Sequence, residues 1–269
     1  MQEAGWGYFG ETLGSGIRVQ VCGRLALVVD GQRREHELPG RQGRELLTLL
    51  VVRRHDFLTR ERIVDLLWEA GAPSAADSAL SALLSKLRRV VGAELLPGKP
   101  EPRLVLPADA YVDFDAAVEA IHRAESAVAG GKWTEAWGPA RVALHTATRG
   151  FLPGHDAGWI EETRRTLEDL RLRGLECVAA AGLGLGGGEL ASVERSARAL
   201  VESWPFRESG YRFLMQALEA QGNVAEAVRV YERLRCLLRD ELGVPPGPEL
   251  QSQHRHLLGL RLGNPEAAA

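Results

Sequence analysis

Short alternating runs of apolar and polar residues mark the start of this chain. Residues 17–21 and 25–29 form two such runs, rich in Val and Leu, and Asp30-Gly31 follows them. Runs of this kind that end at an Asp-Gly pair are typical of strands joined by tight turns. The pattern therefore predicts a small antiparallel sheet over residues 17–38.

The spacing of apolar residues then changes to the period of an α-helix. It predicts three helices, at residues 41–54, 60–69 and 74–91. Thr59 and Ser74 are good N-caps for the second and third helices, and Asp77 would complete a capping box with Ser74.

A proline-rich stretch follows the third helix. Residues 94–106 place apolar positions on both sides of the segment from Pro97 to Pro102, which predicts a hairpin with a stiff tip. A small sheet, three helices and a terminal hairpin, in this order, form the layout of a winged helix-turn-helix domain.

The third predicted helix has two different faces. Its apolar face consists of Leu80, Leu83, Leu84, Leu87 and Val91. Its opposite face consists of Ser78, Ser81, Ala82, Ser85, Lys86 and Arg89, with Arg88 at the margin. Small residues permit close approach to a DNA groove, and the later basic residues suit phosphates or guanine edges.

Candidate DNA contacts also come from the start of the second helix and from the hairpin. The full set is Thr59, Arg60, Ser78, Ser81, Ser85, Lys86, Arg88, Arg89, Lys99 and Arg103. A simpler interpretation remains for the basic residues of the third helix, because a basic last turn complements the helix dipole.

Charge is distributed unevenly between the two parts of the chain. Residues 17–106 contain 15 Lys and Arg against 11 Asp and Glu, a net charge of +4, whereas the whole chain has a net charge of −3. Nucleic-acid binding depends on where the basic groups lie rather than on the mean. The distribution favours DNA binding by the first part.

The second part has a helical pattern throughout. It predicts helices at 114–129, 133–146, 160–181, 189–202, 206–221, 224–242 and 248–260, and the glycine-rich residues 182–188 predict a flexible turn. An internal repeat appears in Gly131, Trp133, Ala136, Ala140 and Ala143, in Gly188, Leu190, Val193, Ala197 and Leu200, and in Gly222, Val224, Ala227, Tyr231 and Leu234. The last two copies lie 34 residues apart, the spacing of a tetratricopeptide repeat.

The expected fold class is mainly α with a small β component. An N-terminal winged helix-turn-helix would be followed by an all-α, tetratricopeptide-like helical repeat domain. The large aromatic residues of the second part are interpreted as core side chains between helices, with anchors for a protein partner as the alternative: Trp133, Trp137, Trp159, Trp204 and Phe206.

Motifs for catalysis are absent from the sequence. It contains no Gly-x-Ser-x-Gly, no His-Glu-x-x-His and no Cys-x-x-Cys, and His254 and His256 would point to different faces of one helix. We expect no catalytic residue, no metal site and no cofactor. Three cysteines in separate apolar patterns and the lack of a signal peptide or membrane-spanning run predict a cytoplasmic protein without membrane contact.

Several motifs of the sequence are typical of one known family. The motifs are Leu66-Leu67-Trp68, 85–89 (Ser-Lys-Leu-Arg-Arg), 151–154 (Phe-Leu-Pro-Gly), 231–235 (Tyr-Glu-Arg-Leu-Arg) and 238–246 (Leu-Arg-Asp-Glu-Leu-Gly-Val-Pro-Pro). With these motifs the chain resembles the bacterial antibiotic-regulatory-protein-type (SARP-like) activators, in which an OmpR-like winged helix precedes a bacterial transcriptional activator domain. The resemblance covers roughly residues 17–260.

The resemblance implies the domain organisation and the partners. A DNA-binding domain is expected at 17–107 and an activator domain at 111–262, with a flexible N-terminal segment at 1–16 and a tail at 263–269. The expected partners are double-stranded DNA, RNA polymerase and a second copy of the chain in a homodimer. The expected function is sequence-specific binding to repeated promoter sites and activation of transcription.

Another class of function stays open at this point. Ser81, Leu83 and the net negative charge of the chain also fit a protein-interaction adaptor whose winged helix no longer binds DNA specifically. The chain can also be one part of a larger regulator.

Overall fold

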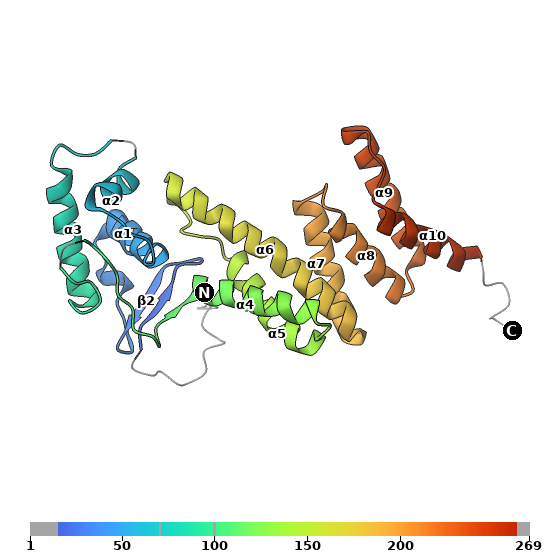
Figure 1. Ribbon diagram of the computed structural model, residues 1–269, viewed down its shortest axis with the longest axis horizontal. Helices are drawn as coiled ribbons and strands as arrows, with labels where there is room; N and C mark the ends of the chain where they lie inside the picture. The colour runs from blue at the N-terminus through green and yellow to red at the C-terminus, as the bar shows by residue number, and fades with distance from the viewer. Residues whose placement is uncertain (1–15, 70, 99–100, 263–269) are drawn as a thin grey trace. The chain divides into compact units, whose positions relative to one another are not determined.

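The structure is a computed structural model that describes residues 16–69, 71–98 and 101–262 (Figure 1). Its chain forms two compact units. The first unit combines the chain up to Ala116 with Arg149–Leu167, and the second combines Ala117–Thr148 with the chain from Glu168. Lys99 and most of the two expected terminal segments lie outside the described residues.

A four-stranded sheet with the order β3-β2-β1-β4 forms one side of the first unit. Its strands are β1 (Arg18–Gln20), β2 (Ala26–Val29), β3 (Gln32–Arg33) and β4 (Tyr111–Val112). The first three pair antiparallel, as the sequence predicts, and Asp30 and Gly31 turn with φ of 51° and 75°. Positive φ at both positions suits a tight hairpin turn. β4, in contrast, pairs parallel to β1.

Three helices pack together beside this sheet. They are α1 (Gly40–Val52), α2 (Arg60–Leu67) and α3 (Ala76–Val91), and both α1 and α2 pack on α3. The N-cap at Thr59 is confirmed, since its hydroxyl accepts a hydrogen bond from the Arg62 amide at 3.2 Å. The capping box at Ser74 is wrong: α3 begins at Ala76, and no side chain caps it.

The hairpin expected at 94–106 does not form regular strands in its described residues. One backbone bond joins its two sides, from the Val105 amide to the Leu95 carbonyl at 2.8 Å. The prolines explain the correction, because each removes a backbone donor that a strand pair needs. The segment is held instead by the buried side chains of Leu96 and Leu104.

Residues after the β4 strand tie distant parts of the chain to the first unit. Asp113, only 2% exposed, begins α4 (Asp113–Ala129). Its carboxylate accepts hydrogen bonds from the Val21 and Cys22 amides at 2.8 and 3.1 Å and from Arg149 at 3.1 Å. Burial raises the pKa of Asp113, and these donors oppose the rise.

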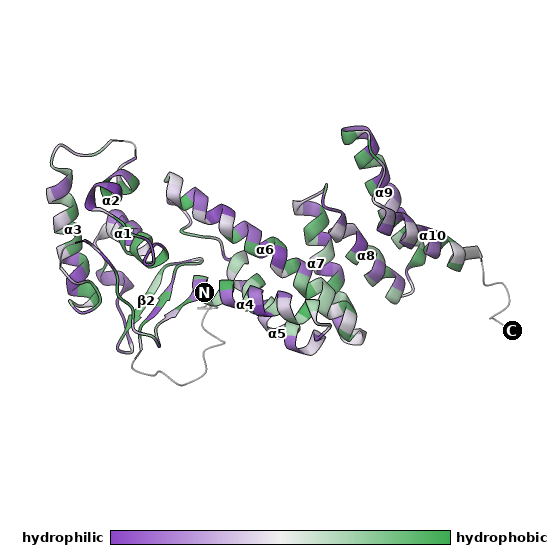
Figure 2. Cartoon of the chain, viewed as in Figure 1, coloured by the Kyte–Doolittle hydropathy of each residue, from purple (hydrophilic) through white to green (hydrophobic). Residues whose placement is uncertain are grey.

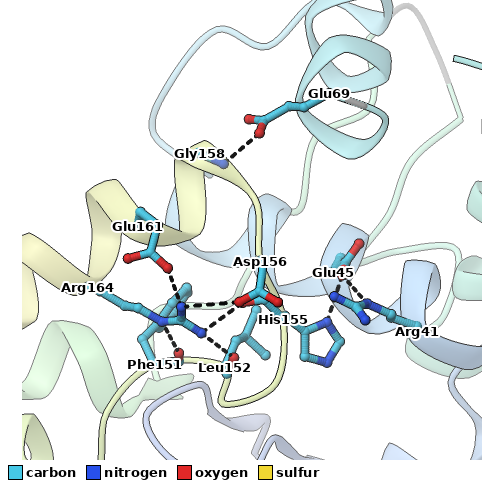
Figure 3. Close-up of polar contacts among 10 residues, drawn as sticks. All are labelled: Arg41, Glu45, Glu69, Phe151, Leu152, His155, Asp156, Gly158, Glu161 and Arg164. Atoms are coloured by element: carbon cyan, nitrogen blue, oxygen red, sulfur yellow. Dashed lines mark hydrogen bonds and ion pairs between the residues drawn. The ribbon is translucent and has the colours of Figure 1, made fainter. Parts of the chain in front are cut away.

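The loop between α5 (Trp133–Thr148) and α6 (Gly158–Leu185) also belongs to this unit at residues 149–157. Figure 3 shows Arg164 of α6 beside this loop, where its guanidinium donates to the carbonyls of Phe151, Leu152 and His155 at 2.8–3.0 Å. The fork of an arginine suits several acceptors at once. Arg164 therefore fixes the path of a loop that has no regular secondary structure.

The same part of the chain is bonded to α1 and to the residues just after α2. His155 Nδ1 lies 2.7 Å from Oε1 of Glu45, a nearly buried residue of α1 that also accepts from Arg41 (Figure 3). The Gly158 amide donates to Glu69 at 2.6 Å, just after α2. The loop is thus a structural part of the unit that contains α3.

The second unit is helical. Besides most of α4, α5 and most of α6, it contains α7 (Leu190–Ser203), α8 (Glu208–Ala220), α9 (Val224–Leu242) and α10 (Pro248–Leu262). Successive helices from α7 to α10 pack against one another. The ribbons of α7, α8 and α9 have one hydrophilic and one hydrophobic side over much of their length (Figure 2). Three apolar positions of each copy are buried, and the first one, Trp133, Leu190 or Val224, is half-buried. The buried ones are Ala136, Ala140, Ala143, Val193, Ala197, Leu200, Ala227, Tyr231 and Leu234. The helical repeat is confirmed.

The glycine-rich turn expected at 182–188 is wrong in its first half. α6 continues to Leu185, so Gly182 and Gly184 are helical. A Cβ atom at Gly184 would lie 2.3 Å from the Trp133 ring, and one at Gly182 would lie 2.6 Å from Val193. These glycines allow two neighbouring helices to approach α6 closely.

The aromatic residues divide between core and surface. Trp159 is buried and packs edge-on against Phe151 at 6.0 Å, whereas Trp133, Trp137 and Trp204 are half-buried. Phe206 is 49% exposed, so the core interpretation is wrong for this residue. Among the described helices, none combines the length and apolar character needed to cross a bilayer.

The close approach at Gly184 leads to a stability prediction. We expect Gly184→Ala to lower the free energy of unfolding by about 1–3 kcal/mol, because the added methyl group displaces the Trp133 ring. Gly259→Ala is the matched control: it also lies within a helix, but its Cβ meets nothing within 4 Å. The control should be stabilised by up to about 1 kcal/mol in thermal or urea unfolding. Equal effects of both changes would contradict the packing at Gly184.

Candidate DNA-binding surface

The exposed face of α3 is the most distinctive surface of the first unit. Leu80, Leu84 and Leu87 are buried on the inner face, and Leu83 is half-buried. The outer face exposes Asp77, Ser78, Ser81, Ala82, Ser85, Lys86 and Arg89. The outer face predicted from the sequence is confirmed. Asp77 also belongs to this face, although the sequence predicted it as part of a capping box.

Charge changes sign along this outer face. Asp77 lies in the first turn of α3, small residues follow, and Lys86 and Arg89 lie near the end. Both ends complement the helix dipole, so this arrangement alone is no proof of DNA contact. Small side chains in the middle nevertheless let the helix backbone approach a flat or grooved partner closely.

Arg60 at the start of α2 is bound to the start of α3. Its Nε donates to Oδ1 of Asp77 at 2.9 Å, and its terminal nitrogen donates to the Ser81 hydroxyl at 2.7 Å. The Arg60 side chain is 33% exposed and that of Asp77 is 76% exposed. Two predicted contact residues, Arg60 and Ser81, are thus bonded to each other, and Asp77, which was not among the predicted DNA contacts, binds the same guanidinium.

Arg88 has a different position from its neighbours. Its Nε donates to the Leu96 carbonyl at 2.7 Å, and its guanidinium reaches the Pro97 carbonyl at 3.5 Å. Because the donor groups point to the segment after α3, Arg88 holds that segment in place. Arg103 of the same segment is exposed, and so is Glu94, which lies between α3 and Arg103 in the sequence.

Thr59 is occupied by its role as a cap, since its hydroxyl accepts from the Arg62 amide. The exposed candidates of α3 are therefore Ser78, Ser85, Lys86 and Arg89, joined by the Arg60–Asp77–Ser81 cluster and Arg103. One feature of the sequence does distinguish Asp77, the partner of Arg60. It is the only carboxylate within residues 76–91.

The Cys22 thiol of this unit is a poor nucleophile. Burial raises the pKa of the Cys22 thiol, and the nearby Asp113 carboxylate raises it further, so the reactive thiolate is disfavoured. Among the described residues no group of His, Cys, Asp and Glu has the arrangement of a metal site. What the surface offers is hydrogen bonding and positive charge, which suit recognition rather than catalysis.

Comparisons with known proteins place this architecture in a family. The model of the bacterial transcriptional activator domain matches residues 112–258. The chain is 32% identical over 243 residues to the regulatory protein AfsR of Streptomyces coelicolor, covering 90% of this chain and 24% of AfsR. It is 26% identical over 263 residues to the transcriptional regulatory protein MoaR1 of Mycobacterium tuberculosis, covering 94% of this chain and 82% of MoaR1.

A solved structure shows the same fold. The chain of Mycobacterium tuberculosis EmbR, in complex with a low affinity phosphopeptide, has a TM-score of 0.75 and 24% identity, covering 91% of this chain and 65% of that one. A mainly helical chain with a small N-terminal sheet is thus the class that the fold defines. The chain belongs to the antibiotic-regulatory-type family of transcriptional regulators, which carry the bacterial transcriptional activator domain. It spans only about a quarter of the length of AfsR.

Neighbouring arginines of α3 should respond differently to substitution. We expect Arg88→Ala to lower the free energy of unfolding by about 1–2 kcal/mol, because the Leu96 carbonyl loses its charged donor. Arg89→Ala changes an exposed side chain and should stay within about 0.5 kcal/mol of the parent. Urea unfolding of the two variants measures both values. Equal stability of the two would show that Arg88 does not hold the segment.

Proposed function

We propose that this regulator binds double-stranded DNA by placing α3 in the major groove. The observation that carries the proposal is the exposed outer face of α3, small and polar at its centre and basic toward its end. α1 and α2 pack on α3, and in helix-turn-helix proteins the helix so supported presents its outer face to base edges.

Two kinds of contact are expected from this face. Lys86 and Arg89 would bind phosphates or guanine edges, and Arg103 would bind a flanking phosphate. Ser78, Ser81 and Ser85 would permit the close approach and add hydrogen bonds. Phosphate contacts of Lys and Arg make the affinity depend on salt, because binding releases counterions from the DNA.

The helical repeat domain would supply the protein contacts of the regulator. Stacked helices from α7 to α10 form the kind of surface that binds protein segments or a second copy of the chain. We therefore propose pairing of two protomers and contact with RNA polymerase, in the cytoplasm where the chromosome lies. Paired protomers would bind repeated sites about one helical turn apart, roughly 10 base pairs.

Substitution of the basic residues tests the placement of α3. We expect Lys86→Ala and Arg89→Ala each to weaken binding and to make the salt dependence less steep by about 0.9 in the log-log slope, the value for one lost phosphate contact. Fluorescence anisotropy across salt concentrations, with duplexes enriched from a randomised pool, measures both quantities.

Arg165→Ala is the matched control, an exposed arginine of the same unit on α6. It should leave the affinity and the slope unchanged. Unchanged binding in both α3 variants would contradict this placement, and absence of any binding at low salt would support the adaptor function instead.

A further inference from the structure

The outer face of α3 has one feature that a general phosphate-binding surface does not need. Asp77, at the end of the helix from which helix-turn-helix proteins read bases, presents a carboxylate that is 76% exposed. A negative charge on a surface that approaches DNA is repelled by the phosphates. A specific role must offset that repulsion if α3 binds as proposed.

Arg60 supplies the first part of the explanation. Its guanidinium lies against Oδ1 of Asp77 at 2.8–2.9 Å, so the pair has no net charge. The Ser81 hydroxyl accepts from the same guanidinium at 2.7 Å, one turn along α3. Asp77 and Ser81, both on α3, hold the Arg60 guanidinium in place. The guanidinium in turn fixes the direction of the Asp77 carboxylate.

The second oxygen of Asp77 remains available. No described residue donates a hydrogen bond to Oδ2, although Oδ1 is occupied by Arg60. A carboxylate oxygen can only accept hydrogen bonds. In the major groove the donors are the N4 amino group of cytosine and the N6 amino group of adenine, whereas guanine O6 and thymine O4 are acceptors.

We propose that Asp77 reads one base that presents an amino group in the major groove, with Arg60 and Ser81 as positioning residues for its carboxylate. The inference rests on the proposed DNA binding by α3. Recognition would combine attraction to the amino group with repulsion of the carbonyl oxygens of guanine and thymine. Lys86 and Arg89 would supply affinity for any sequence, and Asp77 would supply selectivity.

The substitution Asp77→Ala separates these two contributions. Loss of the carboxylate should flatten the preference for cytosine or adenine at one position of the site, a discrimination of about tenfold or more in the parent. The same substitution frees Arg60 for a phosphate, so binding to unselected duplexes should tighten and the log-log salt slope should steepen by about 0.9.

Asp65→Ala is the matched control. Asp65 is an exposed carboxylate of α2, five residues after Arg60 and therefore on another face of that helix. It changes the net charge of the chain equally but should leave base preference and salt slope as in the parent. The double variant Arg60→Ala, Asp77→Ala should return the slope toward the parent value, because no arginine is then released.

Selection from a randomised duplex pool with the intact chain, followed by anisotropy on the selected sites, provides the readout. Loss of the preference at one position in Asp77→Ala alone supports the inference. Unchanged preference in Asp77→Ala, while the parent still selects a motif, overturns the inference and leaves the DNA-binding function in place. A parent chain that binds no duplex overturns both.

Discussion

The fold of the first unit depends on hydrogen-bond partners for its buried polar groups. β1 ends near Gln20, and the next two backbone amides, of Val21 and Cys22, are buried away from any strand partner. The carboxylate of Asp113, distant in sequence, accepts from both amides. A buried donor left without an acceptor costs about 1–3 kcal/mol, so the chain that follows β1 needs Asp113.

The carboxylate in turn needs a partner, because its burial disfavours the charged form. Arg149 provides a donor, and the chain that follows Arg149 is drawn to the sheet: the Gly23 amide donates to the Gly150 carbonyl at 2.7 Å, and Cys22 forms a bridge with Phe151. Arg164 then orders the loop through three carbonyls, and His155 and Gly158 bind acidic residues near α1 and α2. A segment matched by the activator-domain family model therefore completes the unit that presents α3.

Much of this architecture could be predicted from the sequence, because periodicity decides which residues face a core. The helical repeat and the outer face of α3 followed from apolar spacing alone. The hydrogen bonds between distant segments could not be predicted. The local sequence around Asp113, His155 and Arg164 does not indicate which distant residues they contact. Asp77 shows the same limit, because a carboxylate three residues after a serine fits a capping box in sequence although in space it pairs with Arg60.

The glycines at 182–188 illustrate a second limit. Glycine favours turns by its conformational freedom, but it also permits close helix packing, and only the neighbouring Trp133 and Val193 decide between these roles. In the segment at 94–106 the apolar runs favoured a pair of strands, but the prolines prevented the strand pairing. Both corrections come from groups that compete with the apolar pattern.

Hydrogen exchange of the intact chain tests most directly whether the loop at 149–157 forms one cooperative unit with the sheet and with α1, α2 and α3. The amides of Val21, Cys22 and Gly23 all bond to distant segments of this unit, so their exchange should be as slow as that of the core of α1. Arg164→Gln should accelerate all of them together with α1, whereas exchange in α8 and α9 should not change. Rapid exchange at Gly23 beside a fully protected α1 would contradict the account, because the loop would then open on its own.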